Sequence, residues 1–135
     1  MSDDQLPDAI SAASLVLAVL AALYTLWLPQ ITKALAIKPA RDAANRGGQK
    51  SEVMSAIVTK AAPLAAASVG ATAILSDRFV RIAADVWRHH ADWVYDDVKA
   101  LMTLTYILIA LLTVVALVQL GRLLVLHSQL SSTTT

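Results

Sequence analysis

Residues 101–121, LMTLTYILIALLTVVALVQLG, decide the fold class of this chain, because they form a long run without a charged residue. At about 1.5 Å per residue, an α-helix of this length crosses the hydrocarbon core of a bilayer, which is about 30 Å thick. A second run of this kind, AISAASLVLAVLAALYTLWL, occupies residues 9–28, and Tyr24 and Trp27 near its end fit an aromatic belt at the membrane interface. Both runs predict transmembrane helices.

A third segment, residues 56–75, predicts a weaker span. Its uncharged run APLAAASVGATAIL is rich in alanine and is flanked closely by Lys60 and Asp77. We expect it to cross the bilayer with the Lys60 side chain extended toward the headgroups. Because small residues let helix backbones approach closely, we also expect this helix to pack between the other two.

The composition of the chain is that of a membrane protein. Apolar residues make up 57% of it and charged residues 16%, whereas soluble domains average about 25% charged residues. A soluble enzyme is therefore excluded. The absence of cysteine excludes disulfides and thiolate metal ligands, and a net charge of +1 gives no indication of a nucleic-acid partner. We expect an all-α polytopic membrane protein whose residues 1–135 form a single membrane domain.

The two loops, residues 29–55 and 76–100, differ in charge and so predict the orientation. The first loop together with Lys60 has six basic and two acidic residues, whereas the second loop has four basic and five acidic residues. Lysine and arginine are retained on the cytoplasmic side of membranes. The N-terminus is therefore expected outside and the C-terminus in the cytoplasm. The short loops and the high alanine content favour a bacterial inner membrane, with an organelle membrane of bacterial ancestry as the alternative.

The first loop is interpreted as a cytoplasmic helical hairpin. Pro29 is expected to end or bend the first helix, residues 45–48 (NRGG) to form a turn, and Ser51 to begin the next helix. The basic residues of this region are predicted to contact anionic lipid headgroups, with a cytoplasmic protein as the alternative partner. They are Lys33, Lys38, Arg41, Arg46, Lys50 and Lys60.

The second loop contains neither glycine nor proline, and its apolar residues recur at spacings of three and four. This pattern predicts an amphipathic helix at the outer membrane surface. His89 and His90 lie within it, where a pH-sensing role is the alternative to a solvated polar surface. Adjacent histidines point about 100° apart on a helix and no third ligand has suitable spacing, so we expect no metal site.

The uncharged runs of the three spans contain no ionisable residue other than tyrosine. Pumps and secondary transporters use ionisable groups at membrane depth. Intramembrane hydrolysis needs paired aspartates, a serine–histidine pair or a zinc site, none of which these runs provide. We therefore expect no catalytic residue and no cofactor.

Each span has one face of small and hydroxyl-bearing residues at helical spacing. We expect these faces to pack helices closely, with Ala66 and Gly70 as a small-xxx-small pair. Alternatively, they line a water-filled path in an oligomer, because one three-helix chain is too thin to enclose a pore. The residues are Ser11, Ser14 and Thr25 in the first span, Ala66, Ser68, Gly70 and Thr72 in the second, and Thr103, Tyr106 and Thr113 in the third.

These features favour a small non-catalytic integral membrane protein, an accessory or assembly subunit that contributes packing surfaces to a larger membrane complex. The alternative is a homo-oligomeric pore or channel. In architecture alone, such a chain is similar to the phage lysis proteins called holins, some of which are small and three-spanning with the N-terminus outside. The expected partners are the lipid bilayer and either other membrane subunits or further copies of the same chain.

Overall fold

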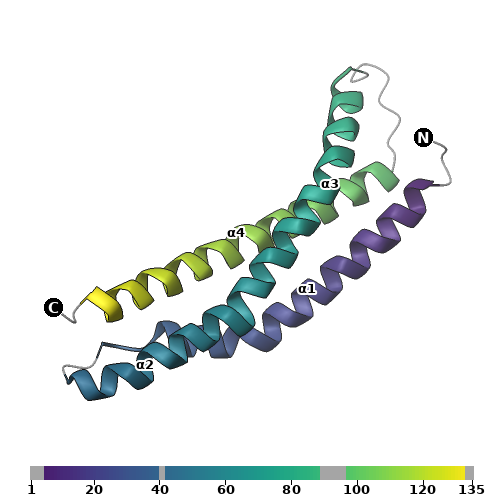
Figure 1. Ribbon diagram of the computed structural model, residues 1–135. Helices are drawn as coiled ribbons and strands as arrows, with labels where there is room; N and C mark the ends of the chain where they lie inside the picture. The colour runs from purple at the N-terminus through teal and green to yellow at the C-terminus, as the bar shows by residue number, and fades with distance from the viewer. Residues whose placement is uncertain (1–4, 40–41, 89–96, 133–135) are drawn as a thin grey trace.

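The computed structural model describes residues 5–39, 42–88 and 97–132 of the chain. Every element within these residues is a helix, and the helices form an elongated bundle (Figure 1). The expected all-α fold class is confirmed. The elements are α1 (Gln5–Leu35), α2 (Ala43–Ala56), the π-helical turn η1 (Ile57–Ala61), α3 (Ala62–Arg88) and α4 (Asp97–Ser132).

Within the described residues, three helical segments are long and apolar enough to cross a membrane: Pro7–Leu35, Ala44–Arg88 and Asp97–Ser132. The second segment is continuous because η1 joins α2 to α3, and it is the least apolar of the three, as the sequence indicated. The start of α1 and the end of α4 lie at opposite ends of the bundle (Figure 1). These features support a membrane protein with three spanning helices.

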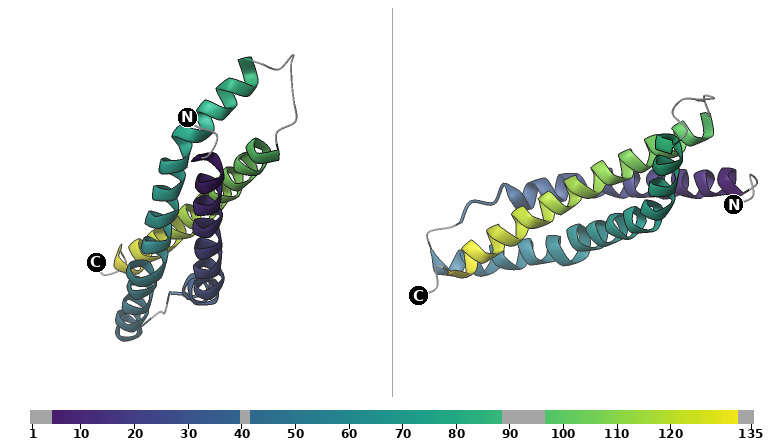
Figure 2. Two further views of the ribbon diagram at one scale, coloured as in Figure 1. Left: turned by 90° about the vertical axis from the view of Figure 1, so that its right-hand side faces the viewer. Right: turned by 90° about the horizontal axis from the view of Figure 1, so that it is seen from above.

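All three long helices contact one another, and Figure 2 shows from two directions how α4 lies obliquely across the other two. The alanine-rich second span is enclosed on one side only. α3 packs extensively against α4 but much less against α1, and Ala66, Ala67 and Ala73 of α3 are exposed. Its small residues therefore form a close contact with one neighbouring helix and leave a second small-residue surface uncovered.

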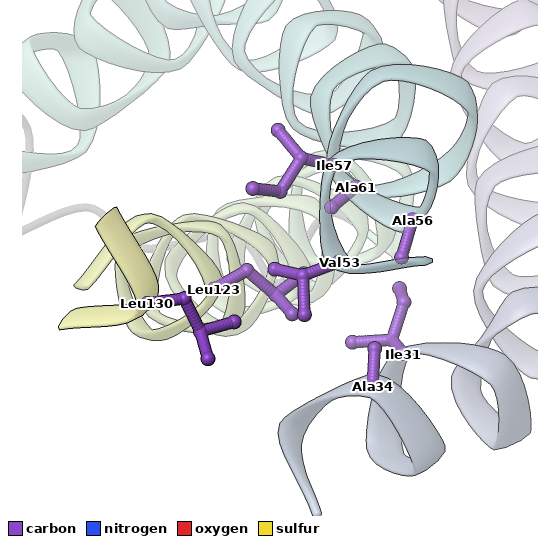
Figure 3. Packing of buried hydrophobic residues seen from close by; sticks show 8 residues of the cluster. All are labelled: Ile31, Ala34, Val53, Ala56, Ile57, Ala61, Leu123 and Leu130. Atoms are coloured by element: carbon purple, nitrogen blue, oxygen red, sulfur yellow. The ribbon is translucent and has the colours of Figure 1, made fainter. Parts of the chain in front are cut away.

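The core consists of three clusters along the bundle. The first joins the end of α1 to α2, η1 and the end of α4, and includes Ile31, Val53 and Leu123 (Figure 3). The middle cluster brings together Leu20, Leu64, Ala65 and Ala116. The third, toward the start of α1, comprises Ile10, Ala13, Leu75, Met102 and Ile109.

The first loop differs from the expected hairpin. α1 continues through Pro29 to Leu35, and the glycines expected to form a turn, Gly47 and Gly48, lie inside α2. Pro29 is tolerated because Ile31 after it is buried against α2, and this packing opposes the cost of about 3 kcal/mol of an internal proline. α2 starts well before Ser51 because it extends a helix that already exists and needs no new nucleus.

The second loop also begins differently from expectation. Residues 76–88 continue α3, so they are not a separate helix after a span ending at residue 75. No glycine or proline interrupts the chain there, and the exposed Asp77–Arg81 pair, 3.0 Å apart, links successive turns. His89 and His90 lie outside the described residues, so the amphipathic surface helix and the pH-sensing role stay predictions.

Candidate functional site

The first candidate site is a hydroxyl cluster between α3 and α4, formed by Ser68, Thr72 and Thr113. The Thr72 and Thr113 Oγ1 atoms lie 2.8 Å apart, and Thr113 Oγ1 lies 3.1 Å from the Ser68 carbonyl oxygen. The Ser68 hydroxyl donates to the Leu64 carbonyl at 2.8 Å and has no exposed surface. Three residues predicted to face a packing surface or a pore are thus brought together by helix packing.

Every hydroxyl in this cluster has a partner within the protein. A threonine hydroxyl has one proton, so Thr72 can donate to Thr113 while Thr113 donates to the carbonyl of Ser68 or Ile109, at 3.1 and 2.8 Å. Ser68 and Thr113 are both buried. Within a single chain, the Thr113 hydroxyl therefore links α4 to Thr72 and to the Ser68 carbonyl of α3, and the buried Ser68 and Thr113 side chains do not line a water-filled path.

Tyr24 of α1 and Gln119 of α4 form a second polar contact between helices. Gln119 Nε2 donates to the Tyr24 hydroxyl oxygen at 3.1 Å, and both side chains are half-buried. Trp27 packs against the core clusters at the middle and at the end of α1. Tyr24 and Trp27 thus also join α1 to the bundle, whereas sequence reasoning assigned them only to an interfacial belt.

Four other predicted residues make only local or modest contacts. Thr103 donates to the Lys99 carbonyl of its own helix at 2.9 Å, and the Tyr106 ring stacks on Phe79 of α3 with centroids 4.3 Å apart. Ala66 is exposed, and a Cβ added at Gly70 would meet no atom within 4 Å. The Ala66–Gly70 pair therefore makes no close helix contact within the chain, and its role in association stays a prediction.

The outer face of α1, which comprises Ser11, Ser14, Ala18, Ala22 and Thr25, is exposed along its whole length. In the most apolar stretch of this first spanning segment only 11% of the residues are buried, compared with 28% in each of the other two segments. The Thr25 hydroxyl donates to the Ala21 carbonyl at 2.8 Å, so its hydrogen is used within the helix. The predicted small-residue face of the first span thus points away from the bundle.

The basic residues of the first loop gather at the end of the bundle near the end of α4, which we call the basic end (left in Figure 1). Lys33, Lys38 and Lys50 are exposed, Arg46 and Lys60 are half-buried, and Arg41 lies outside the described residues. A cleft of about 450 Å³ opens here between α1 and the α2–η1 segment. Among its lining residues are Gln30, Lys33, Ser51, Glu52, Ser55 and Lys60.

A second cleft at the basic end, of about 460 Å³, lies between the last turn of α1 and α4. Its walls are largely apolar, with Leu35, Val125 and Leu126 beside Arg122. The first cleft has more charged and polar groups than the second. Its lining includes the ammonium groups of Lys33 and Lys60, the Glu52 carboxylate, the hydroxyls of Ser51 and Ser55 and the Gln30 amide. An ionic ligand therefore fits the first cleft better than the second.

Toward the opposite end of the bundle, Asp77 and Asp85 form surface ion pairs with Arg81 and Lys99. Lys99 at the start of α4 lies 3.1 Å from Asp85 of α3, and both side chains are partly exposed. In the described part of the chain, no three histidine, cysteine, aspartate or glutamate side chains are grouped so that they could hold a metal ion.

Comparison of the chain with protein-family models, curated proteins and solved structures found no match.

Proposed function

We propose that this chain is a small non-catalytic integral membrane protein that serves as an accessory or assembly subunit of a larger membrane complex. The observation in favour is the outer face of α1, where small and hydroxyl-bearing residues are exposed over several turns. Ser14, Ala18 and Ala22 follow one another at intervals of four, the small-xxx-small spacing that lets a second helix approach closely. A helix of another subunit is the proposed occupant.

The proposed location is a bacterial inner membrane, with the N-terminus outside and the basic end in the cytoplasm. Lysine and arginine are in excess on one side of the bundle. Among the described residues, Lys33, Lys38, Arg46, Lys50, Lys60 and Arg122 belong to the basic end, against Arg78, Arg81, Arg88 and Lys99 toward the other end. This is the distribution that retains a segment on the cytoplasmic side. The start of α1 and the end of α4 then lie on opposite sides of the membrane, as three crossings require.

The test is native mass spectrometry of the chain extracted gently from its own membrane. Ala18→Leu places a bulky side chain at the centre of the outer face of α1 and should remove co-extracted membrane subunits, because close helix approach is blocked. Val114→Leu, at an exposed site on α4, is the matched control and should leave the complex intact. Co-extraction that survives Ala18→Leu would contradict the proposed surface.

A homo-oligomeric pore is the second candidate, because the Ser11, Ser14 and Thr25 side chains are exposed on α1. In a ring of identical chains, these three residues and not the buried Ser68 and Thr113 would line the path. A discrete homo-oligomer in the same spectra, together with ion flux that Ser14→Leu blocks, would favour this function. A mixed complex without ion flux would favour the accessory role.

A further inference from the structure

The cleft between α1 and the α2–η1 segment has features of a binding site for a phosphate-bearing headgroup. Its volume of about 450 Å³ lies within the range of about 300–1,000 Å³ that is common for small-ligand sites. Lys33 and Lys60 outnumber its one carboxylate, Glu52, so the local charge is positive. Ser51, Ser55 and Gln30 add hydroxyl and amide donors suited to phosphate oxygens.

The π-helical turn η1 explains why Lys60 lines this cleft. Position 60 follows Ile57, Ala56 and Val53 by three, four and seven residues, and all three are buried. In an uninterrupted α-helix, Lys60 would therefore point into the core. In η1, the Ala62 amide instead donates to the carbonyl of Ile57, five residues earlier, and this wider turn moves Ala61 into the core in place of Lys60.

Pro63 accounts for the wide turn. Proline has no amide hydrogen, so it cannot donate to the carbonyl of Thr59, and its ring crowds that carbonyl in a regular α-helix. In membrane helices, a local π-helical adjustment is one of the ways in which the backbone groups freed by a proline are satisfied again. Turns of this kind occur often at functional sites. Here the turn has a definite effect, because it brings an ammonium group to the cleft wall.

The apolar surface beside the cleft indicates that the phosphate belongs to a lipid. Gln30 and Lys33 follow Leu26 by four and seven residues, so the three share one face of α1, and Leu26 is 65% exposed. Val58 follows the cleft residue Ser55 by three positions and is also exposed. A lipid phosphate bound in the cleft would have its acyl chains against this apolar surface. Basic pockets between spanning helices are a known form of anionic-lipid site.

We infer that the cleft binds the phosphodiester headgroup of an anionic phospholipid, with Lys60 as the main contact to phosphate. This inference does not depend on the proposed subunit role. Glu52 Oε1 lies 3.8 Å from Lys33 Nζ, so the Glu52 carboxylate neutralises part of the positive charge of Lys33. Removal of the Glu52 carboxylate should therefore strengthen lipid binding and removal of the Lys60 ammonium should weaken it. General charge attraction gives the same two signs, so the specific site is tested by removing the same charge inside and outside the cleft.

The experiment measures lipid adducts on the detergent-purified full chain by native mass spectrometry during titration with phosphatidylglycerol, with phosphatidylcholine as the neutral reference. Lys60→Gln should weaken phosphatidylglycerol binding about fivefold, the effect of losing one cation near a phosphate. Lys50→Gln is the matched control: it removes the same charge from α2 outside the cleft and should change affinity less than twofold. Glu52→Gln should strengthen binding.

Gly48→Leu tests the cleft without altering its charge. No atom lies within 4 Å of an added Cβ at Gly48, and leucine favours the helix more than glycine does, so the variant should fold and fill the cleft. It should weaken phosphatidylglycerol binding at least as much as Lys60→Gln. Equal losses for Lys60→Gln and Lys50→Gln, or unchanged binding in Gly48→Leu, would overturn the inference. Displacement of the lipid by millimolar inorganic phosphate would overturn the lipid as the source.

Discussion

The α3–α4 interface and the outer face of α1 contain the same residue types at the same helical spacing, but they face opposite environments. In α3, Ser68 is fully buried and Thr72 contacts Thr113 of α4. In α1, Ser14 and its small neighbours are exposed, whereas larger residues such as Leu20 point into the core. One small-residue face is thus used within the chain and the other is not.

This difference shows that helical spacing identifies which residues share a face of a helix, but not whether that face is directed into the bundle or away from it. Lipid tails are as apolar as leucine, so burial of large residues gives little advantage, and the closest available helix contact matters more. α4 presents Thr113 opposite Ser68 and Thr72, which gives the polar face of α3 a partner. α1 meets its neighbours through larger residues, and its small face remains available for another helix.

Added bulk at the α3–α4 interface should have the largest effect on stability. Ser68→Leu forces a larger side chain into a site without exposed surface, and overpacking of this kind costs about 1–3 kcal/mol. Ser14→Leu, on the exposed face of α1, should change the free energy of unfolding by less than about 0.5 kcal/mol. Unfolding of both variants in lipid–detergent micelles measures the difference. Equal losses would contradict the contrast between the two faces.

Loss of the hydroxyl contact between α3 and α4 should have a smaller effect. Thr113→Val keeps the shape of the side chain but removes its contacts with Thr72 and with the Ser68 carbonyl. Hydrogen bonds between membrane helices contribute about 0.6 kcal/mol on average and up to about 1.7 kcal/mol. Thr105→Val is the matched control, because among residues 5–39, 42–88 and 97–132 the hydroxyl of buried Thr105 bonds only to the Leu101 carbonyl of its own helix, at 2.9 Å. The same unfolding assay should show a greater loss for Thr113→Val.

The three spans could be predicted from the sequence, but the ends of the helices could not. An uncharged run identifies the part of a helix that crosses the hydrocarbon core, whereas charged residues at its edge do not end the helix. α3 therefore continues past Asp77 and Arg78 to Arg88. In the first loop, the packing of Ile31 after Pro29 outweighed a local signal for helix ending. Such packing depends on distant residues and is invisible in a local window.

The candidate sites were also predictable only in part. The spacing of hydroxyl residues marks Ser68, Thr72 and Thr113, but it marks Ser11 and Ser14 equally. Whether such a residue contacts another helix depends on which helix packs against its face, and the spacing does not specify this. The contact between Tyr24 and Gln119 joins residues far apart in the chain, and no local pattern links them. The register change at η1 has one local signal, Pro63, which lies inside an uncharged run and leaves that run unbroken.

The Tyr24–Gln119 contact should have the smallest measurable effect, because it is one half-buried hydrogen bond, whereas two link α3 and α4 in the hydroxyl cluster. Tyr24→Phe removes the hydroxyl and should cost at most about 0.6 kcal/mol. Tyr106→Phe is the matched control: within the described residues its hydroxyl makes no hydrogen bond, and the variant keeps the ring that stacks on Phe79. A cost for Tyr24→Phe above that for Thr113→Val would mean that α1 is held to the bundle by polar contacts as firmly as α3 is. Because α1 joins the core mainly through apolar residues, we expect the opposite order, which leaves its small face free to bind another helix without rearrangement of the bundle.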